Sequence, residues 1–473
     1  MKPKIWAIAI LLFSAQFCAA QVPATAPAAE QQAKAWLDVF NSADRSALLA
    51  FLQKNRPNAV DRLDSAMEFR ERSGGLQLVE IEESTPTRFT AFVQEKDSDQ
   101  FGHIAVEVEP APPYRIINFE IRAIPRPAKF AIPRLNQKEA IEALNRKLQE
   151  EAARDSFSGT ALVAQNGMVL FQHAYGLADR ATNAPNTLDT QFRLGSMNKM
   201  FTAVSVLQLV QSGKLQLNDA FGKYLSDYPN KDMASKVTIQ QLLTHTGGTG
   251  DIFGPEFDKH RLELKTLQDY VRLYGDRPVA FEPGSRFEYS NYGFLLLGVI
   301  IEKVSNQTYY DYVREHVFKP AGMNSTDSLP EDQPVASRST GYMKEASGPW
   351  MENKDTLPYR GTSAGGGYST VVDLYRFAMA LQQHKLLDAA HTEMLVTGKV
   401  DTGHGPDKYA FGFFETDSNG LKCFGHAGGA PGMNGELKIC PKAGYVIAVL
   451  ANLDPPAAQR ASDFIANRLP LNK

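Results

Sequence analysis

The sequence predicts an α+β fold, a sandwich in which an antiparallel sheet is flanked by helices and joined to an all-helical region, with a small α+β domain before it. An N-terminal stretch with helical periodicity gives way to segments in which apolar residues alternate with a period of two. An Asn-Gly pair at residues 166–167 separates two apolar runs, which is typical of a hairpin. Strand-like runs return near the C-terminus beyond a helix-rich middle, so we expect one sheet assembled from distant segments.

The length and composition favour a globular protein of two or more domains. The chain has 473 residues, of which 43% are hydrophobic and 22% are charged, so it can bury a sizeable core. Lys and Arg number 50 against 53 Asp and Glu, which gives a net charge of -3. This balance excludes the broad basic field of a nucleic-acid-binding protein and a polybasic membrane patch. We therefore expect a small-molecule or cell-wall-derived substrate, and the oligomeric state is not predicted.

The first twenty residues have the order of a secretory signal peptide. Two lysines precede an apolar stretch over residues 5–13, and small residues follow up to Ala20. We expect cleavage after Ala20 and a periplasmic or secreted mature protein without a membrane span. One alternative is a retained N-terminal anchor, although the apolar stretch is short for a span. Lipidation at Cys18 is a weaker alternative, because a bulky residue precedes that cysteine.

Residues 30–123 are predicted to form the small α+β domain. Residues 33–72 show the periodicity of helices. Four segments then alternate in the manner of antiparallel strands, namely residues 76–81, 88–94, 103–108 and 114–121. The letters W-L-D-V-F-N-S-A-D-R at residues 36–45 resemble the start of nuclear transport factor 2-like domains. That resemblance implies a sheet that curls around a helix.

A Pro-rich linker at residues 124–135 separates this domain from a second domain at residues 136–469. The second domain opens with an amphipathic helix over residues 136–154 and a hairpin around the Asn-Gly pair. The further predicted helices cover residues 200–210, 292–304 and 457–467, and the predicted strands cover residues 159–164, 168–175, 411–416, 421–426, 436–439 and 445–450.

Only Cys423 and Cys440 remain once the signal peptide is removed. Two cysteines cannot build a zinc cluster, and no C-x-x-C pair is present for redox chemistry. The two flank a predicted hairpin with its turn near Pro431-Gly432, where direct cross-strand neighbours could form a disulfide in an oxidising compartment. Two unpaired, partly buried thiols are the open alternative.

Ser196 and Lys199 stand at the start of an apolar helix, directly after Gly195. Positions i and i+3 of a helix face the same way, and free backbone N–H groups at its start create a positive local field. Lys199 can then accept the proton of Ser196, provided that burial or neighbouring cations keep it partly neutral. The alternative is a helix-capping serine beside a solvated lysine, which this spacing alone does not exclude.

Tyr289-Ser290-Asn291 precedes a second apolar helix. The phenol of Tyr289 could carry a proton between nucleophile and leaving group, and Asn291 could orient Lys199 and a substrate amide. Alternatively, Ser290 caps the helix and Tyr289 fills core space.

Gly425-His426-Ala427-Gly428-Gly429 lies at the end of a predicted strand. Small residues at a strand edge allow a substrate to lie alongside as an added strand, while a backbone N–H stabilises an oxyanion. His426, Gly428 and Gly429 are therefore candidates for substrate and oxyanion binding. The alternative is a Gly-rich turn with an exposed histidine.

Ser-x-x-Lys, Tyr-Ser-Asn and His-x-Gly, in this order, resemble the serine β-lactamase and penicillin-binding-protein superfamily, and in particular its class C-like branch. The resemblance extends over residues 136–469. Its further motifs are T-I-Q-Q-L-L-T-H-T-G-G at residues 238–248, F-E-P-G-S-R-F-E-Y-S-N-Y-G at residues 281–293, K-P-A-G-M at residues 319–323 and G-G-G-Y-S-T-V-V-D-L at residues 365–374. The fold that this implies is the β-lactamase/transpeptidase-like sandwich.

The resemblance also implies a role for each motif residue. Ser196 would be the acylated nucleophile and Lys199 its proton acceptor. Tyr289 would be a shared acid/base group and Asn291 a positioning residue. The backbone N–H groups of Ser196 and Gly429 would form the oxyanion hole.

His426 stands where β-lactamases and many carboxypeptidases of the superfamily carry lysine. Because histidine is largely neutral near pH 7, capture of a substrate carboxylate by a fixed charge is not expected. We expect a serine acyl-hydrolase acting on a small ester or a D-amino-acid peptide or amide. The alternatives are a D-alanyl-D-alanine carboxypeptidase, a β-lactamase, or a non-catalytic penicillin-binding-like sensor.

Other polar residues are assigned structural roles. His245 in T-H-T-G-G is expected on a turn after a helix, since Ser196 already has a base three residues away. Thr370 and Asp373 form a helix-capping pattern, and residues 365–367 form a tight turn facing the site. The histidines show no metal-ligand spacing, so we expect neither a metal nor another cofactor.

Overall fold

The computed structural model describes residues 26–344, 348–403 and 407–471, so the predicted signal peptide at residues 1–20 lies outside the described residues. The chain divides into two units. The first contains residues up to Leu63 with Leu78–Val93 and His103–Arg122, and the second contains Asp64–Gln77, Gln94–Gly102 and the chain from Ala123 onward. The predicted domain boundaries stay a prediction.

The N-terminal elements follow the predicted order of helices and then strands. Three helices, α1 (Ala28–Asn41), α2 (Arg45–Asn55) and α3 (Leu63–Ser73), precede a sheet whose strand order is β1-β2-β3-β4. Its strands are β1 (Leu76–Ser84), β2 (Arg88–Glu95), β3 (Phe101–Val108) and β4 (Ile116–Ile124). The last strand begins two residues later than predicted, because Tyr114 has a φ of 56° in a turn closed by its N–H and the carbonyl of Ala111.

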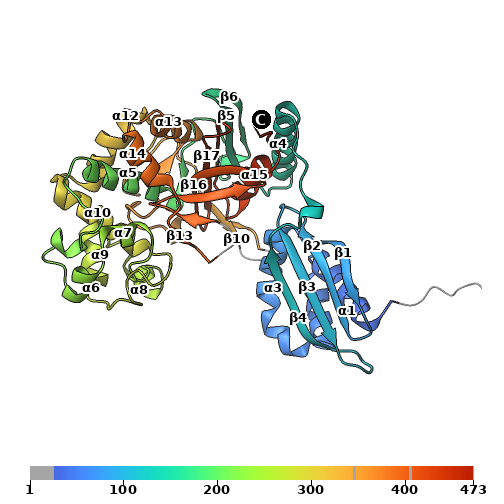
Figure 1. The fold of residues 1–473 in the computed structure, drawn as a ribbon. Helices are drawn as coiled ribbons and strands as arrows, with labels where there is room; N and C mark the ends of the chain where they lie inside the picture. Colours follow the sequence, from blue (N-terminus) through green and yellow to red (C-terminus); the bar gives the residue numbers. More distant parts are fainter. Residues whose placement is uncertain (1–25, 345–347, 404–406, 472–473) are drawn as a thin grey trace, which may run out of the picture. The chain divides into compact units, whose positions relative to one another are not determined.

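An eight-stranded antiparallel sheet lies at the centre of the larger unit (Figure 1). Its strand order is β13-β14-β15-β16-β17-β18-β5-β6. These strands are β5 (Gly159–Gln165), β6 (Met168–Tyr175), β13 (Val400–Asp401), β14 (Lys408–Tyr409), β15 (Phe414–Ser418), β16 (Leu421–Ala430), β17 (Met433–Cys440) and β18 (Tyr445–Ala451). Because β5 pairs with β18, the expectation of one sheet built from distant segments is confirmed.

Both faces of this sheet are buried, which explains why its central strands are continuous apolar runs. Along β18, Val446, Ala448 and Leu450 face one hydrophobic core, while Ile447 and Val449 face a second. The second core is closed by two helices that lie side by side in Figure 1, α4 (Gln137–Ala153) and α15 (Ala457–Ala466). At the start of α4, Asn136 and Glu139 form a reciprocal capping box.

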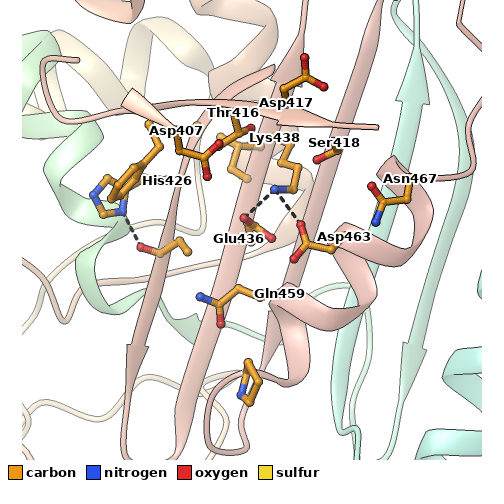
Figure 2. Close-up of a pocket in the computed structure, with 15 residues that line it drawn as sticks. Asp407, Thr416, Asp417, Ser418, His426, Glu436, Lys438, Gln459, Asp463 and Asn467 are labelled. Carbon is orange, nitrogen blue, oxygen red and sulfur yellow. Dashed lines mark hydrogen bonds and ion pairs between the residues drawn. The ribbon is translucent and has the colours of Figure 1, made fainter. Parts of the chain in front are cut away.

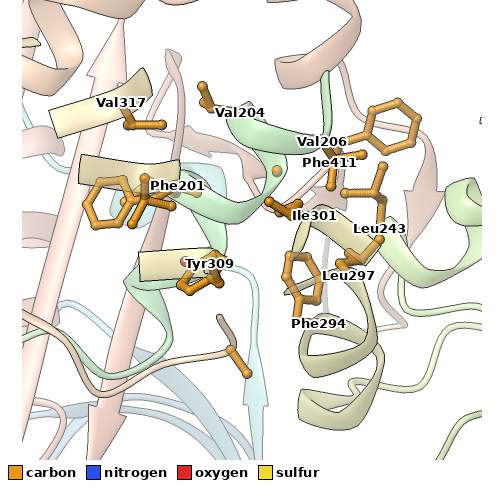
Figure 3. Packing of buried hydrophobic residues seen from close by; sticks show 14 of the residues in the cluster. Phe201, Val204, Val206, Leu243, Phe294, Leu297, Ile301, Tyr309, Val317 and Phe411 are labelled. Carbon is orange, nitrogen blue, oxygen red and sulfur yellow. The ribbon is translucent and has the colours of Figure 1, made fainter. Parts of the chain in front are cut away.

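The first core packs the opposite face of the sheet against the helical region. Two buried apolar helices cross it, α5 (Asn198–Gln211) and α10 (Asn291–Ser305), and Figure 3 shows their side chains interleaved. The remaining helices are α6 (Lys231–Lys236), α7 (Ile239–Leu243), α8 (Pro255–His260), α9 (Leu267–Tyr274), α11 (Tyr309–Val313), α12 (Lys319–Ala321), α13 (Val371–Gln382) and α14 (Ala389–Val396). Within the described residues, none of the helices combines the length and the apolar character needed to cross a membrane.

Short strand pairs complete the unit. They are β7 (Leu177–Asp179) with β8 (Ala184–Pro185), β9 (Phe192–Arg193) with β12 (Tyr368–Ser369), and β10 (Tyr342–Lys344) with β11 (Trp350–Glu352). Of these strands, β9 comes just before the turn that carries Ser196, and it pairs with β12.

One predicted strand is shorter than expected. Residues 411–413 are not part of β15, which begins at Phe414. Gly412 has a φ of +69°, and a Cβ at this position would stand 2.7 Å from the carbonyl oxygen of Lys199. The chain therefore turns at Gly412 to pass closely beside α5 before the strand begins.

The predicted hairpin around Pro431-Gly432 is confirmed by the pairing of β16 with β17. Cys423 and Cys440 are cross-strand neighbours in it and form a disulfide, which decides between the two alternatives that the sequence left open.

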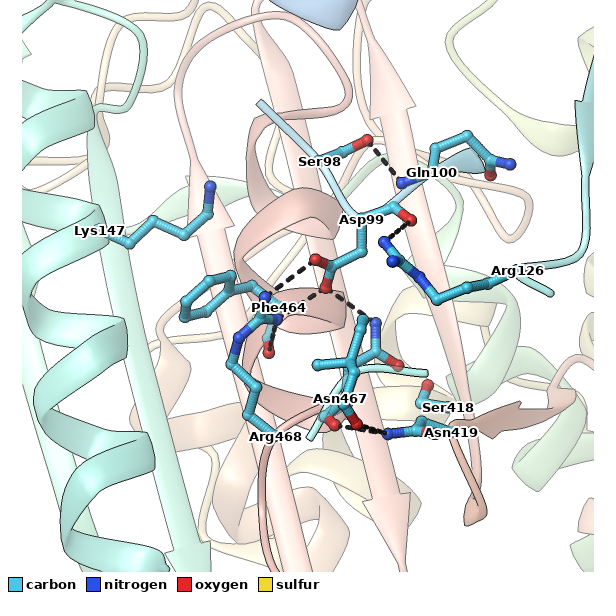
Figure 4. A network of polar contacts seen from close by, with 12 residues as sticks. Ser98, Asp99, Gln100, Arg126, Lys147, Ser418, Asn419, Phe464, Asn467 and Arg468 are labelled. Atoms are coloured by element: carbon cyan, nitrogen blue, oxygen red, sulfur yellow. Dashed lines mark hydrogen bonds and ion pairs between the residues drawn. The ribbon is translucent and has the colours of Figure 1, made fainter. Parts of the chain in front are cut away.

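A polar network holds residues 94–102 against the C-terminal helix within the second unit (Figure 4). The carboxylate of Asp99 accepts hydrogen bonds from Arg468 at 2.7 and 3.0 Å and from the Asn467 amide at 3.1 Å. Burial alone would raise the pKa of Asp99, but the bonds from Arg468 hold it below its ordinary value. Arg126 donates to the Asp99 carbonyl at 2.8 Å.

Candidate active site

Ser196 lies on a 3₁₀ turn, Gly195–Met197, that leads directly into α5. The sequence predicted Ser196 on the first turn of the α-helix, and the structure places it one turn earlier. Gly195 has a φ of +51°, and a Cβ on it would stand 2.8 Å from the backbone nitrogen of Gly429. The turn therefore needs glycine both for its backbone conformation and for its close approach to β16.

Lys199 points from the first turn of α5 toward Ser196 and is fully buried. Its Nζ lies 3.2 Å from Ser196 Oγ, 2.7 Å from Asn291 Oδ1 and 2.7 Å from the carbonyl oxygen of Ala364. It also stands 4.7 Å from the centre of the Tyr289 ring. The predicted pair is thus brought together, and every partner of the amine is a fixed protein group.

Burial lowers the pKa of Lys199 to about 7, against a smaller opposing effect of the Asp251 carboxylate. A lysine with this pKa is neutral in a large fraction of molecules at neutral pH. Its free lone pair can then accept a proton from the Ser196 hydroxyl.

Asn291 is the first residue of α10, and Asp251 fixes the orientation of its side chain. Asp251 accepts hydrogen bonds from the Asn291 amide Nδ2 at 3.1 Å and from the Asn291 backbone N–H at 3.3 Å. Because a carboxylate only accepts, the amide NH₂ must face Asp251 and the amide oxygen must face Lys199. Asp251 was missed by the sequence reasoning, although its place after the Gly-rich stretch 247–250 was a usable signal.

Tyr289 lies between the Ser196–Lys199 pair and a cluster of aromatic rings. Burial raises the pKa of Tyr289, and a side-chain hydrogen bond with Ser196 opposes this only in part, so the group is a phenol at neutral pH. The ring of His245 lies 4.2 Å from the Tyr289 ring, centre to centre. His245 sits on the turn after α7 with a φ of 57°, and its Nδ1 accepts the backbone N–H of Ser290 at 3.0 Å. These contacts are structural, as the sequence predicted for His245.

The Ser290 hydroxyl caps α10 by accepting the N–H of Gly293, as one interpretation of the Tyr-Ser-Asn tripeptide predicted. The catalytic roles predicted for Tyr289 and Asn291 stay a prediction. The predicted cap at α13 is also present, with Thr370 accepting the N–H of Asp373. The predicted turn at residues 365–367 faces the nucleophile, since the N–H of Gly366 donates to the carbonyl of Gly195 at 3.0 Å.

Gly428 and Gly429 bring β16 against the Ser196 turn. A Cβ on Gly428 would stand 1.8 Å from the carbonyl oxygen of Leu194 and 3.1 Å from the backbone nitrogen of Ser196. Only glycine allows this approach, which places backbone amides from two distant segments beside Ser196.

His426 is buried in β16 with both ring nitrogens occupied. Nδ1 lies 2.5 Å from the carbonyl oxygen of Ala427, a contact that Figure 2 draws, and Nε2 lies 3.2 Å from Tyr409 Oη. Burial, together with a smaller effect of the nearby Lys199 charge, lowers the pKa of His426 to about 3. The expectation of a neutral histidine here agrees with this shift. Tyr409 was missed, since nothing in its local sequence links it to residue 426.

Three cavities border the site. One of about 440 Å³ adjoins Tyr289, one of about 470 Å³ adjoins His426 and is shown in Figure 2, and one of about 680 Å³ adjoins Gly429. Among the described residues, no group of three His, Cys, Asp or Glu side chains could hold a metal ion.

Comparisons with known proteins agree with this geometry. The family model described as Beta-lactamase matches residues 144–471, more than half of the chain. Penicillin-binding protein 4 of Amycolatopsis lactamdurans is 30% identical over 320 residues, which cover 62% of this chain and 80% of that protein.

Solved structures show the same likeness. The penicillin-binding protein from Bacillus halodurans has 33% identity and a TM-score of 0.61, covering 67% of this chain and 98% of that one. A D-stereospecific amidohydrolase from Streptomyces sp. has 26% identity and a TM-score of 0.58, covering 68% and 97% of the two chains. The matched family begins at residue 144, so the resemblance of residues 36–45 to nuclear transport factor 2-like domains stays a prediction. The chain belongs to the beta-lactamase and penicillin-binding-protein superfamily of serine hydrolases.

Proposed function

We propose that this serine hydrolase is an acyl-hydrolase that forms an acyl-enzyme on Ser196, with Lys199 as the base, and acts on a small ester or a D-amino-acid peptide or amide. The observation that carries the proposal is the buried Lys199 Nζ, 3.2 Å from Ser196 Oγ. Its pKa of about 7 makes the neutral amine available at physiological pH.

In the first step, Lys199 Nζ takes the proton of Ser196 Oγ as Oγ forms a bond to the substrate carbonyl carbon. The backbone N–H groups of Ser196 and Gly429 stabilise the oxyanion. The bond to the leaving group then breaks, and the phenol of Tyr289 supplies the proton that the leaving group needs, drawing its replacement from Lys199. Water attacks the acyl-enzyme by the reverse proton path, which restores Ser196 and releases the acid.

Two observations support this range of substrates. His426 is neutral, so it supplies no fixed charge for the carboxylate of a β-lactam or of a C-terminal D-alanine. One solved relative is described as a D-stereospecific amidohydrolase, and this likeness supports D-amino-acid amides as substrates of the present protein. We also propose that the protein is exported to the periplasm or secreted, on the strength of its N-terminal sequence.

A fluorophosphonate probe tests the proposal directly. Intact-mass analysis should show one covalent adduct on the wild type and none on Ser196→Ala. Ser205→Ala is a matched control, because Ser205 lies on the same helix and its hydroxyl bonds only the Phe201 carbonyl among the described residues. Equal labelling of Ser196→Ala would contradict the assignment.

A substrate panel then separates the alternatives. p-Nitrophenyl esters, D-aminoacyl amides and a chromogenic cephalosporin should be compared under steady-state conditions. Turnover of the first two classes supports the proposal, whereas preference for the cephalosporin would indicate a β-lactamase. A burst of acylation without turnover would indicate a sensor.

A further inference from the structure

The imidazole of His426 forms a closed hydrogen-bonded pair with Tyr409. Nδ1 faces the carbonyl oxygen of Ala427, which can only accept, so the proton of the neutral ring must be on Nδ1. Nε2 is then an acceptor, and the hydroxyl of Tyr409 at 3.2 Å must donate to it. Neither ring nitrogen is left for a substrate.

This pair lies in a dry aromatic cluster. Tyr409 is fully buried and His426 is 3% exposed. The ring centre of His426 lies 5.1 Å from that of Phe414 and 6.4 Å from that of Tyr289, while His245 lies 4.6 Å from Tyr409. Burial raises the pKa of Tyr409 and lowers that of His426, so both groups are neutral in this environment.

A substrate carboxylate would also need a cation as partner. Among the described residues that line the cavities around the site, each Lys is already paired with a carboxylate. In the cavity beside His426, Lys438 is held between Glu436 at 2.9 Å and Asp463 at 3.1 Å (Figure 2). The cavity beside Tyr289 presents the carboxylates of Glu288 and Asp407 and neither Lys nor Arg.

The cavity beside Gly429 and the surroundings of Ser196 likewise provide no unpaired cation among the described residues. Lys344, in the cavity beside Gly429, is bonded to Glu71 at 2.6 Å. Lys199 accepts a proton only in its neutral form, so the base in its working state carries no charge either. Among the described residues that line these three cavities, the charged groups are thus either paired or negative.

We propose that Tyr409 is a specificity-determining positioning residue: by occupying His426 Nε2 it removes the motif histidine from substrate recognition, and the site selects acyl donors whose leaving group is uncharged or cationic. This inference rests on the proposed acyl-hydrolase function and narrows its substrate class. Tyr409 acts through His426 and does not touch the reacting atoms.

A matched pair of depsipeptides tests the selectivity. D-alanyl-D-lactate and D-alanyl-D-lactamide differ only in the carboxylate of the leaving group. The wild type should hydrolyse the lactamide with a kcat/KM about tenfold higher or more, since the carboxylate must be desolvated without a partner. Equal values, or a preference for the lactate, would overturn the proposal.

The variant Tyr409→Phe keeps the ring and removes the donor. His426 Nε2 then lacks a partner, and a substrate carboxylate beside it would favour the protonated ring. The KM for the lactate should therefore fall, and the ratio of the two kcat/KM values should narrow. The kcat for the lactamide should change little. Tyr375→Phe is the control, because it loses a hydroxyl bond to the Gly167 carbonyl outside the described site. A structural defect would slow both substrates alike and would count against the proposal.

Nitrogen-15 NMR of histidine-labelled protein tests the pair without any substrate. The spectrum should show His426 neutral with its proton on Nδ1, assigned by comparison with His426→Gln, and Tyr409→Phe should shift the Nε2 resonance. A proton on Nε2 in the wild type would disprove the arrangement. If the fluorophosphonate probe failed to label Ser196, the proposed function would fail while this measurement still decided the tautomer.

Discussion

At the scale of single residues, Lys199 shows how much chemistry depends on surroundings. The amine makes contact with two protein oxygens that favour its charged form, and burial favours the neutral form more strongly. A solvated lysine at the same i+3 spacing would stay protonated and could not accept the proton of Ser196.

The rate of acylation should therefore follow the titration of Lys199. Because its pKa is lowered to about 7, the base is protonated and inactive below this pH and free above it. The second-order rate constant for fluorophosphonate labelling, measured between about pH 5 and about pH 9, should rise through neutrality and then level off. A rate that still climbed at the alkaline end would indicate an ordinary lysine.

Asp251 should set the position of that titration. Its negative charge raises the pKa of Lys199, so Asp251→Asn should move the midpoint of the pH profile to lower pH. Asparagine can still accept from the Asn291 amide, which keeps the change mainly electrostatic. Asp258→Asn, an exposed carboxylate in the same segment, is the control, and a midpoint that moved equally in both variants would contradict this role.

At the scale of elements, the approach of β16 to the 3₁₀ turn sets the position of the proposed oxyanion hole. The two segments touch through glycine backbones, because Gly428 leaves no room for a side chain against Leu194. A strand and a turn that lie more than 200 residues apart in sequence are thereby brought into register at Ser196.

Gly428→Ala should separate these elements and lower kcat/KM by about 100-fold or more, since small displacements of reacting groups have effects of this size. Far-ultraviolet circular dichroism should show that the fold is kept. Gly213→Ala is the control: Gly213 has a φ of +72°, but a Cβ there meets nothing within 4 Å, so activity should persist. Full activity of Gly428→Ala would argue against an oxyanion hole at this strand.

At the scale of the whole molecule, the site belongs to one part of the chain. The side-chain hydrogen bonds described for Lys199, Asn291 and His426 all come from residues after position 195. Arg134 anchors the start of this part, donating to the carbonyls of Ser418, Asn419 and Ala466.

A shortened protein that begins at Ile132 should therefore be labelled by the fluorophosphonate probe at the same rate as the full-length protein. A protein that begins at Asn136 lacks Arg134 and should melt at a lower temperature. Its free energy of unfolding should fall by about 1 kcal/mol for each hydrogen bond that is lost. Labelling rates and thermal melts of both proteins check this. A loss of labelling in the longer of the two would show that the N-terminal region contributes to the site.

Much of the fold could be predicted because its signals are local. The Asn-Gly turn, the cap of α13 and the continuous apolar strands depend on residues a few positions apart. The strand predicted from residue 411 was wrong at its start. The chain turns at Gly412 because it packs closely against Lys199, which is distant in sequence.

The sequence by itself determined that Ser196 and Lys199 can face the same way, since residues three positions apart on a helical turn lie on one side of it. Only the tertiary structure decided that Lys199 is buried, as the proposed base must be. It also decided that Asp251 orients the Asn291 amide and that the Tyr409 hydroxyl occupies Nε2 of His426. The physical reason is range: desolvation and long-range hydrogen bonds depend on segments that the chain brings together only when it folds.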